Sequence, residues 1–464
     1  MMNQSTSRQY LFAADILLDS GWHKNKTLVI ENGVITDITD DRPADAVIAN
    51  GPVIPGMVNC HSHAFQRGFA GFSEQGSESK DSFWTWRKIM YKFVDHISPE
   101  QAKIIARQLY IEMLKAGYTR VAEFHYLHHD PQGNPYPQLS TMARSVFDAA
   151  SDAGIGMTML PVLYRFSGFG PAEPTHGQRR FINSIAQFNQ LVSECFDYAK
   201  SLTNANVGIA PHSLRAVDLP SLQAAVQHLK DLDANAPVHI HIAEQMQEVN
   251  DCLQHYQKRP VQWLLDNMDV DQHWCLIHAT HINHRELQGI ADAGAIAGIC
   301  PTTEANLGDG IFPTEEFLDV GGQLAIGSDS HISVSATEEL RLLEYAQRLQ
   351  KQQRAVLANS TTPSVGRNLW QHSAKGGALS TSSNTGVIAI GRQADLLVLD
   401  AEKLRLYAGG SDYRMDSFIF ACASNAVRDV MVAGQWVIDD YQHAQQQQSA
   451  DDFATVIEQL SAGS

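Results

Sequence analysis

The sequence predicts an α/β protein: a (β/α)8 barrel of the TIM type with a small β-sandwich domain built from both chain ends. Short apolar segments alternate with helix-like segments through the middle of the 464 residues, and this alternation is typical of parallel strands joined by helices. Both ends of the chain have strand character instead. A doubly wound open sheet is the structural alternative, but no Gly-x-Gly-x-x-Gly follows the first apolar strand, which disfavours its dinucleotide-binding version.

Residues 1–56 are expected to form the N-terminal part of the small β-domain. The segment TLVIENGVITDI (27–38) alternates in character, and Asn32-Gly33 in its middle favours a two-residue hairpin turn. An apolar strand punctuated by Pro and Gly then leads into the barrel.

The metal-dependent catalytic barrel is expected over residues 57–375. Helices are predicted by segments such as PEQAKIIARQLYIEMLKAG (99–117) and LPSLQAAVQHLKDLDAN (219–235). Eight short apolar runs predict the barrel strands: PGMVNC, YTRVAEF, IGMTMLPVL, NVGIAPH, APVHIHI, HWCLIH, GAIAGIC and GQLAIGS.

Residues 376–440 return to strand character in SNTGVIAIGRQADLLVLD and NAVRDVMVAGQWVID, and we expect them to complete the small β-domain. Residues 441–464 form a polar C-terminal tail. A surface helix preceded by a loosely ordered glutamine run is predicted there.

The net charge of −17 argues against nucleic acid and anionic membranes as partners. No apolar run approaches the ~20 residues that cross a bilayer, and the N-terminus lacks the pattern of a secretory signal. The six cysteines are scattered without a Cys-x-x-Cys pair, which fits a reducing compartment. We therefore expect a cytoplasmic protein acting on a small molecule, and a homodimer, since dimers are common among soluble enzymes. An anionic substrate would need local arginines to offset the protein's charge.

Histidines gather where the predicted strands end, which is the functional face of such a barrel. With 20 histidines in 464 residues, this clustering is hard to assign to chance. The residues concerned are His61 and His63 (first strand), His125 and Tyr126 (second), His212 followed by Arg215 (fourth), His239 and His241 followed by Glu244 (fifth), His278 (sixth) and Asp329 (eighth).

Four of these residues predict a metal site. Alternation along a strand places His61 and His63 on one face, so that both can reach one point. Imidazole nitrogens with one carboxylate form a common catalytic zinc site that leaves a position for water, and the metal lowers the pKa of that water to roughly 7. We expect one zinc per chain, although iron(II) or manganese would suit the same ligands. The predicted ligands are His61, His63, His241 and Asp329.

Other roles remain open for several of these residues. His61 and His63 could be ordinary polar residues at a strand end. His239 lies on the same strand face as His241 and is an alternative ligand. Asp329 could cap the helix that SDSHISVSATEEL precedes, a role that does not exclude metal ligation. Loop positions around the site are expected for His125, His128 and His129.

The segments PGMVNCHSH, HIHIAEQ, LIHATHI and IGSDSH resemble the amidohydrolase superfamily in its deaminase branch, over nearly the whole chain. The resemblance implies the same four metal ligands, with Glu244 as proton shuttle and His278 and Asp329 near the attacking water. Two-metal members carry a carboxylated lysine at the end of strand four. The segment NVGIAPHSLRAV has no lysine, so one metal is implied.

Further segments, HSHAFQRGFAG, FWTWRKIMY, AEFHYLHHD, APHSLRAV and PTTEANLGDG, are similar to the formimidoylglutamate deiminase family of histidine degradation. That family hydrolyses N-formimino-L-glutamate to N-formyl-L-glutamate and ammonia, with metal-activated water attacking the formimino carbon. The resemblance implies a substrate site formed by Gln66, Arg87, Tyr126, His212 and Arg215.

The physics of the substrate agrees with this resemblance. A glutamate derivative carries two carboxylates, and the planar guanidinium fork of arginine suits a carboxylate. The alternative for Arg87 and Arg215 is a surface salt bridge, worth little. A related aminohydrolase acting on a purine or guanidino compound is the competing function. A non-catalytic structural homologue is a remote one, because such proteins usually lose metal ligands.

Overall fold

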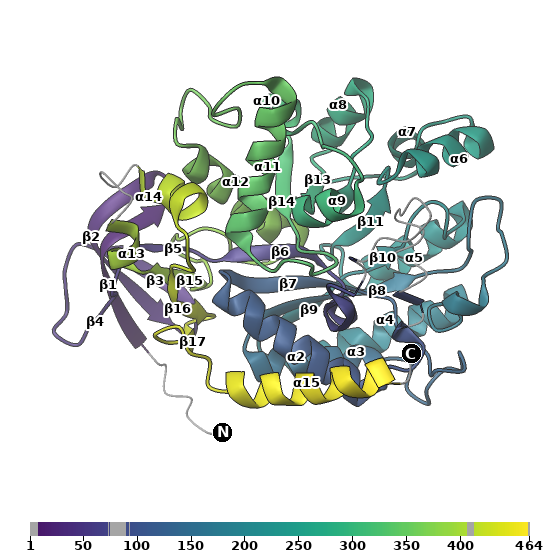
Figure 1. Ribbon diagram of the computed structural model, residues 1–464, viewed down its shortest axis with the longest axis horizontal. Coiled ribbons are helices and arrows are strands. Elements are labelled where there is room, and N and C mark those ends of the chain that lie inside the picture. The colour runs from purple at the N-terminus through teal and green to yellow at the C-terminus, as the bar shows by residue number, and fades with distance from the viewer. Residues whose placement is uncertain (1–7, 73, 75–89, 92, 406–412, 463–464) are drawn as a thin grey trace.

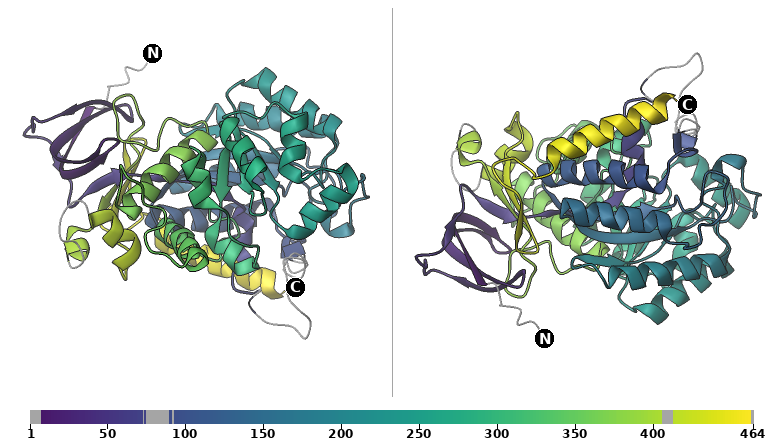
Figure 2. Two further views of the ribbon diagram at one scale, coloured as in Figure 1. Left: turned by 90° about the horizontal axis from the view of Figure 1, so that it is seen from above. Right: turned by 90° about the horizontal axis from the view of Figure 1, so that it is seen from below.

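The structure, a computed structural model, describes residues 8–72, 74, 90–91, 93–405 and 413–462. Two sheets organise the chain. A parallel barrel surrounded by helices forms the larger part, and a smaller sheet lies at one end of it (Figure 1). Seen from above and below, the small sheet projects from the barrel along the longest axis of the molecule (Figure 2).

The barrel strands are all parallel and follow the order of the chain around the sheet. The two ends of the hydrogen-bonded path meet, because isolated bridges join Ile209 to Val238 and Ser213 to His241. The predicted (β/α)8 barrel is therefore confirmed. Its strands are β6 (Met57–Ser62), β7 (Tyr118–His125), β8 (Gly156–Leu163), β10 (Ala210–Pro211), β11 (Val238–Ile242), β12 (Trp274–His278), β13 (Ile296–Ile299) and β14 (Gln323–Ile326), with β9 (Ala205–Val207) paired to β8.

Helices cover the outside of the barrel. The predicted helix at 99–117 forms α2 (Pro99–Lys115), and its start is fixed by a capping box in which Ser98 and Gln101 bond each other's backbone amides. The other covering helices are α3 (Thr141–Ala153), α4 (Ile185–Ala199), α5 (Leu219–Leu232), α6 (Met246–Tyr256), α7 (Pro260–Asn267), α8 (His284–Asp292), α9 (Pro301–Leu307), α10 (Thr314–Asp319), α11 (Ala336–Lys351) and α12 (Val365–Ser380), with short 3-10 helices at Ala64–Phe69 and His176–Gln178.

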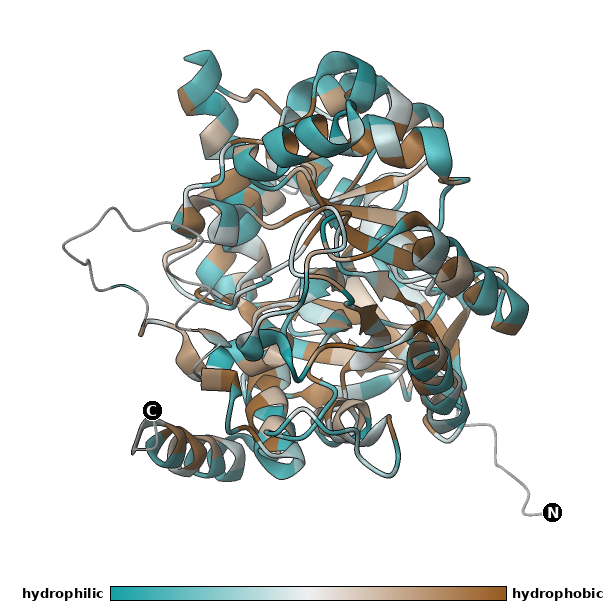
Figure 3. Cartoon of the chain, turned by 90° about the vertical axis from the view of Figure 1, so that its right-hand side faces the viewer, coloured by the Kyte–Doolittle hydropathy of each residue, from teal (hydrophilic) through white to brown (hydrophobic). Residues whose placement is uncertain are grey.

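The core lies between the strands and these helices. Every residue of β7 and β8 is buried, as expected for parallel strands covered on both faces. In β7 the buried set includes the charged side chains of Arg120 and Glu123. In Figure 3 the apolar strands occupy the centre and the helices present polar surface outward.

The second sheet joins the two ends of the chain in the order β17-β16-β15-β5-β1-β2-β3, with β4 beside β1. The predicted hairpin turn at Asn32-Gly33 is confirmed, since both residues have positive φ and Glu31 pairs with Val34. Residues of both halves share one apolar cluster. The strands are β1 (Arg8–Leu18), β2 (Gly21–Glu31), β3 (Val34–Thr39), β4 (Val47–Ile48), β5 (Val53–Pro55), β15 (Leu396–Leu399), β16 (Val427–Val432) and β17 (Gln435–Ile438).

A single residue separates the small sheet from the barrel. Gly56 lies between β5 and β6, and a Cβ there would come within 2.3 Å of the Thr119 side chain. Only glycine fits this approach, and through this one residue β5 continues into β6, the strand that carries His61.

The prediction of a loosely ordered glutamine run was wrong. Gln446 begins helix α15 (Gln446–Ala462), which runs along α2 (Figure 2). Lys115 donates to Gln446 at 2.9 Å, and Arg107 pairs with Asp452 at 2.5 Å. Buried Val456 adds apolar contact. Tertiary packing therefore overrides the composition of this segment.

The remaining described elements are α13 (Ala401–Arg405), α14 (Arg414–Asp416) and a π-helical turn at Ser417–Ala421. The domain limits at 56, 375 and 440 stay predictions, and α12 runs through residue 375 to Ser380. Among the described residues, no helix combines the length and apolar character needed to span a bilayer.

Candidate active site

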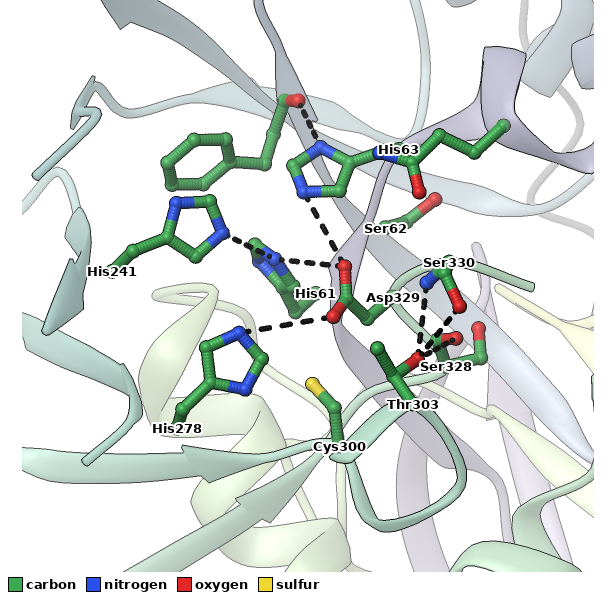
Figure 4. A network of polar contacts seen from close by, with 12 residues as sticks. His61, Ser62, His63, His241, His278, Cys300, Thr303, Ser328, Asp329 and Ser330 are labelled. Carbon is green, nitrogen blue, oxygen red and sulfur yellow. Dashed lines mark hydrogen bonds and ion pairs between the residues drawn. The ribbon is translucent and has the colours of Figure 1, made fainter. Parts of the chain in front are cut away.

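Three strands bring the predicted metal ligands together at one end of the barrel (Figure 4). The Nε2 atoms of His61 and His63 each lie 3.4 Å from Asp329 Oδ1. His241 Nε2 lies 3.0 Å from His61 Nε2. These distances show that the ligand atoms converge on one point. All four side chains are buried.

The backbone around β6 explains this convergence. Ser62 points the other way from its two neighbours and donates to Glu123 Oε2 at 2.6 Å. Asp329 N donates to the carbonyl of His61 at 3.0 Å, which ties the end of β14 to β6. A Cβ at Gly327 would lie 2.8 Å from His61 Cβ, so this close approach of the two strands requires glycine.

The hydrogen bonds of the histidines fit metal ligation. His63 Nδ1 lies 2.9 Å from the carbonyl of Phe124, and His241 Nδ1 lies 3.1 Å from the carbonyl of His212. Since a carbonyl only accepts, both Nδ1 atoms carry the proton and both Nε2 lone pairs face the centre. Burial lowers the pKa of His61, His63 and His241, which keeps the rings neutral, as metal ligands must be.

The alternative roles of His239 as a ligand and Asp329 as a helix cap find no support in the geometry. His239 Nε2 bonds the carbonyl of Ser380 at 2.6 Å instead of joining the other histidines. Helix α11 is capped by the Ser335 side chain rather than by Asp329. His128 and His129 bond the carbonyls of Val162 and Ile182, so these two rings hold loops in place.

Glu244 and His278 stand beside the ligand cluster. His278 Nε2 lies 3.9 Å from Glu244 Oε1 and 3.7 Å from Asp329 Oδ2. Burial opposes protonation of His278, but the carboxylates of Glu244, Glu304 and Asp329 outweigh it and raise its pKa to about 10. Burial also raises the pKa of Glu244, which the cationic ring of His278 partly offsets. The pair thus combines a proton donor and an acceptor near one point.

Local backbone geometry aims both residues. Ala243, just before Glu244, has φ 51°, and His278 itself has φ 67°. The amides of Ala243 and Glu244 donate to the two carboxylate oxygens of Glu248, each at 3.2 Å. These bonds stabilise an uncommon backbone conformation of the kind that concentrates at functional sites.

A pocket with an empty volume of about 520 Å³ opens onto this cluster, within the range of small-molecule sites. Most of the predicted substrate residues line it, whereas Arg87 and its FWTWRK segment lie outside the described residues. The lining residues are His63, Gln66, Met90, Tyr91, Tyr126, Tyr164, Phe181, His212, Arg215, His241, Glu244, His278, Thr303, Leu307 and Asp329.

Arg215 gives the pocket a cationic side. Its Nη1 atom is buried and has no hydrogen-bond partner among the residues that the structure describes. Gln66 donates to the Tyr126 hydroxyl at 3.0 Å, and its own buried Oε1 has no partner within the described ranges. Because an unpaired buried donor is costly, the Arg215 geometry fits a site completed by an anionic ligand.

The sequence did not single out Tyr164, Thr303 and Glu304. Tyr164 follows the third strand, where no histidine drew attention, and Thr303 and Glu304 lie in PTTEANLGDG after the seventh. Their position just beyond a strand end was the available signal.

Comparison with known proteins identifies the family. The model of the amidohydrolase family matches residues 53–437, and the chain belongs to this family of metal-dependent hydrolases. Formimidoylglutamate deiminase from Pseudomonas aeruginosa is 47% identical over 97% of this chain and 99% of its own. From the same organism, 8-oxoguanine deaminase is 26% identical over 89% of each chain. A crystal structure of an amidohydrolase from Brucella melitensis superposes with a TM-score of 0.93 at 44% identity, covering 97% and 99% of the two chains.

The predicted family, the fold and a hydrolytic enzyme are therefore confirmed. The described residues also contain grouped metal-ligand candidates at the predicted place. The homodimer and the cytoplasmic location stay predictions.

Proposed function

We propose that this chain hydrolyses N-formimino-L-glutamate to N-formyl-L-glutamate and ammonia, as a step of histidine degradation. The observation that carries the proposal is the polarity of one pocket, with carboxylates at one side and, at another, Arg215, whose buried Nη1 atom has no hydrogen-bond partner among the described residues. The relative named formimidoylglutamate deiminase supports it, since it matches almost the full length of the chain.

The substrate has the same polarity as the pocket. Its formimino group is an amidine, which is basic and takes a positive charge, and its glutamate part carries two negative carboxylates. Glu244 and Asp329 suit the amidine end, and Arg215 suits a carboxylate. A neutral purine would leave Arg215 without a partner, which disfavours a purine deaminase.

We assign one zinc ion to His61, His63, His241 and Asp329, whose converging lone pairs and low-pKa imidazoles suit a divalent metal. When bound, the metal supplies a nucleophile at neutral pH by lowering the pKa of a coordinated water.

The chain's own residues bind the substrate and move protons. In the proposed mechanism, the glutamate part of the substrate is held so that the formimino carbon faces Glu244. The residues that hold it are Arg215, Gln66, Tyr126 and His212, together with Arg87, which lies outside the described residues. Glu244 accepts a proton from the attacking water and delivers it to the imine nitrogen. His278 and Asp329 orient that water. A second proton, from the hydroxyl group that the water leaves on the formimino carbon, then passes to the same nitrogen. The C–N bond breaks as the C=O bond forms, and the nitrogen leaves as ammonia.

The test measures ammonia released from N-formimino-L-glutamate by purified protein, with the metal content determined on the same sample. Rapid release with about one zinc per chain is the expected result. A panel with N-formimino-L-aspartate, guanine, adenosine and a guanidino acid serves as comparison. Bound metal without ammonia from the glutamate derivative, but with turnover of another compound, would overturn the substrate assignment and leave the metal site standing.

A further inference from the structure

Glu304 contacts His278 from the side opposite the pocket. It lies on α9, directly after β13, and is only 3% exposed. Its Oε1 atom is 3.2 Å from His278 Nδ1 and also accepts the backbone N–H of Cys300 at 2.8 Å. One carboxylate oxygen thus joins the histidine ring to the start of the helix.

The bond from Cys300 decides which partner donates. A backbone amide always donates, so it fixes Glu304 Oε1 in the acceptor position. His278 Nδ1 then has to carry a proton to complete its contact with the same oxygen. The other nitrogen, Nε2, is left to face Glu244 and Asp329 at 3.9 and 3.7 Å.

We propose that Glu304 is a positioning residue, which fixes the ring orientation of His278 and keeps the proton on Nδ1 so that Nε2 faces the reacting water. Such a carboxylate behind a histidine is a common means of orienting an imidazole at a metal site. The expected effect of Glu304 on turnover rests on the proposed function. The hydrogen bonds of Glu304 to His278 and Cys300 are independent of that function.

A second cation is the competing interpretation of the same atoms. Ligand atoms of His278, Cys300 and Glu304 all lie within 4.8 Å of one another. However, burial raises the pKa of Cys300 well above its usual value, which keeps it a thiol, whereas a metal binds the thiolate. Glu304 Oε1 already accepts from Cys300 N–H and contacts His278 Nδ1, so we assign the cluster to hydrogen bonding.

The test compares Glu304→Gln with Glu304→Leu. The Gln oxygen can still accept from both Cys300 and His278, whereas Leu accepts from neither. We expect Glu304→Gln to keep kcat within about threefold and Glu304→Leu to lose about 10- to 100-fold, with KM and metal content unchanged in both. Glu286→Gln is the matched control, since Glu286 is equally buried but bonds Arg259 away from the pocket, and it should leave kcat unchanged.

A second readout does not depend on turnover. In protein with ¹⁵N-labelled histidine, the ring signals of His278 are those that disappear in His278→Asn. The wild type and Glu304→Gln should show a protonated Nδ1 sheltered from solvent exchange, and Glu304→Leu should lose it. An unchanged Nδ1 proton in Glu304→Leu, equal loss of kcat in both variants, or two metal ions per chain would overturn the inference. A wild type that is inactive on N-formimino-L-glutamate but shows the expected proton pattern would instead count against the proposed function alone.

Discussion

Replacing Arg215 with Met tests the carboxylate side of the pocket. The buried Nη1 of Arg215 has no hydrogen-bond partner in the described part of the chain, so a substrate carboxylate would be the group that it pairs with. A hydrogen bond to a charged group contributes about 1.5–3 kcal/mol, and about 1.4 kcal/mol corresponds to a factor of ten. Arg215→Met should therefore lower kcat/KM by roughly 10- to 150-fold per bond lost, with little change in metal content.

The assay pairs the variant with altered substrates. N-formimino-L-glutamine lacks the side-chain carboxylate, and N-formimino-L-isoglutamine lacks the α-carboxylate. If Arg215 binds one of them, the variant and the wild type should differ little on the substrate that lacks that group. This double cycle isolates the pair from general effects of the substitution.

Arg165→Met is the matched control. Arg165 follows Tyr164 at the same rim, but it pairs with Asp218 at 3.4 Å and does not line the pocket. We expect its kcat/KM to stay within about twofold, because half-exposed ion pairs contribute little. Wild-type kcat/KM in Arg215→Met, or an equal loss on all three substrates, would refute the carboxylate assignment.

Three further predictions concern the metal centre and the protein's stability. Glu244→Gln should keep its metal and lose about 10²–10⁴-fold in kcat; a near-normal kcat would remove Glu244 from the mechanism. Dialysis against a chelator should abolish ammonia release and lower the Tm by a few °C, because a bound metal stabilises the folded state by about 2.7 kcal/mol at a concentration 100-fold above Kd. Added zinc should restore both activity and Tm. An unchanged Tm would contradict the buried ligand set. Burial lowers the pKa of His125 from 6.5 to about 4, so below pH 6.5 only the unfolded chain binds that proton, and the resulting loss of stability grows as the pH falls towards 4. Urea unfolding should show about 2 kcal/mol less loss between pH 8 and pH 5 in His125→Gln than in wild type, and parallel pH curves would contradict this.

The strand-end residues were predictable because of a geometric rule. Parallel strands of a barrel end on one rim, so His61, His241 and Asp329 had to lie near one another once eight strands were recognised. The choice of His241 over His239 was not predictable by periodicity, since both share a strand face. The choice depends on how far along the strand each ring lies. The His239 ring lies where it bonds the carbonyl of Ser380.

Other features depend on contacts that a sequence pattern does not contain. Glu304 sits in a short polar helix, and such a charge is usually a solvated one. The role of Glu304 depends on its contacts with Cys300 and His278, which form only in the folded chain. The segment with the glutamine run is helical and packs on α2, where Lys115 bonds Gln446 and Arg107 pairs with Asp452. Composition alone does not reveal these partners.

β5, which leads into the strand that carries His61, pairs with β15. During synthesis β15 is made much later than β5. Ile54 faces Leu397 across this pair, and β15 in turn is flanked by β16. Since β5 runs through Gly56 into β6, the strand that leads to His61 and His63 gains this neighbour only after synthesis has passed Leu399. A chain that ends before β15 therefore carries its first two metal ligands on a strand whose N-terminal extension, β5, has β1 but not β15 beside it. We expect such a chain to hold the metal less stably than the finished polypeptide does.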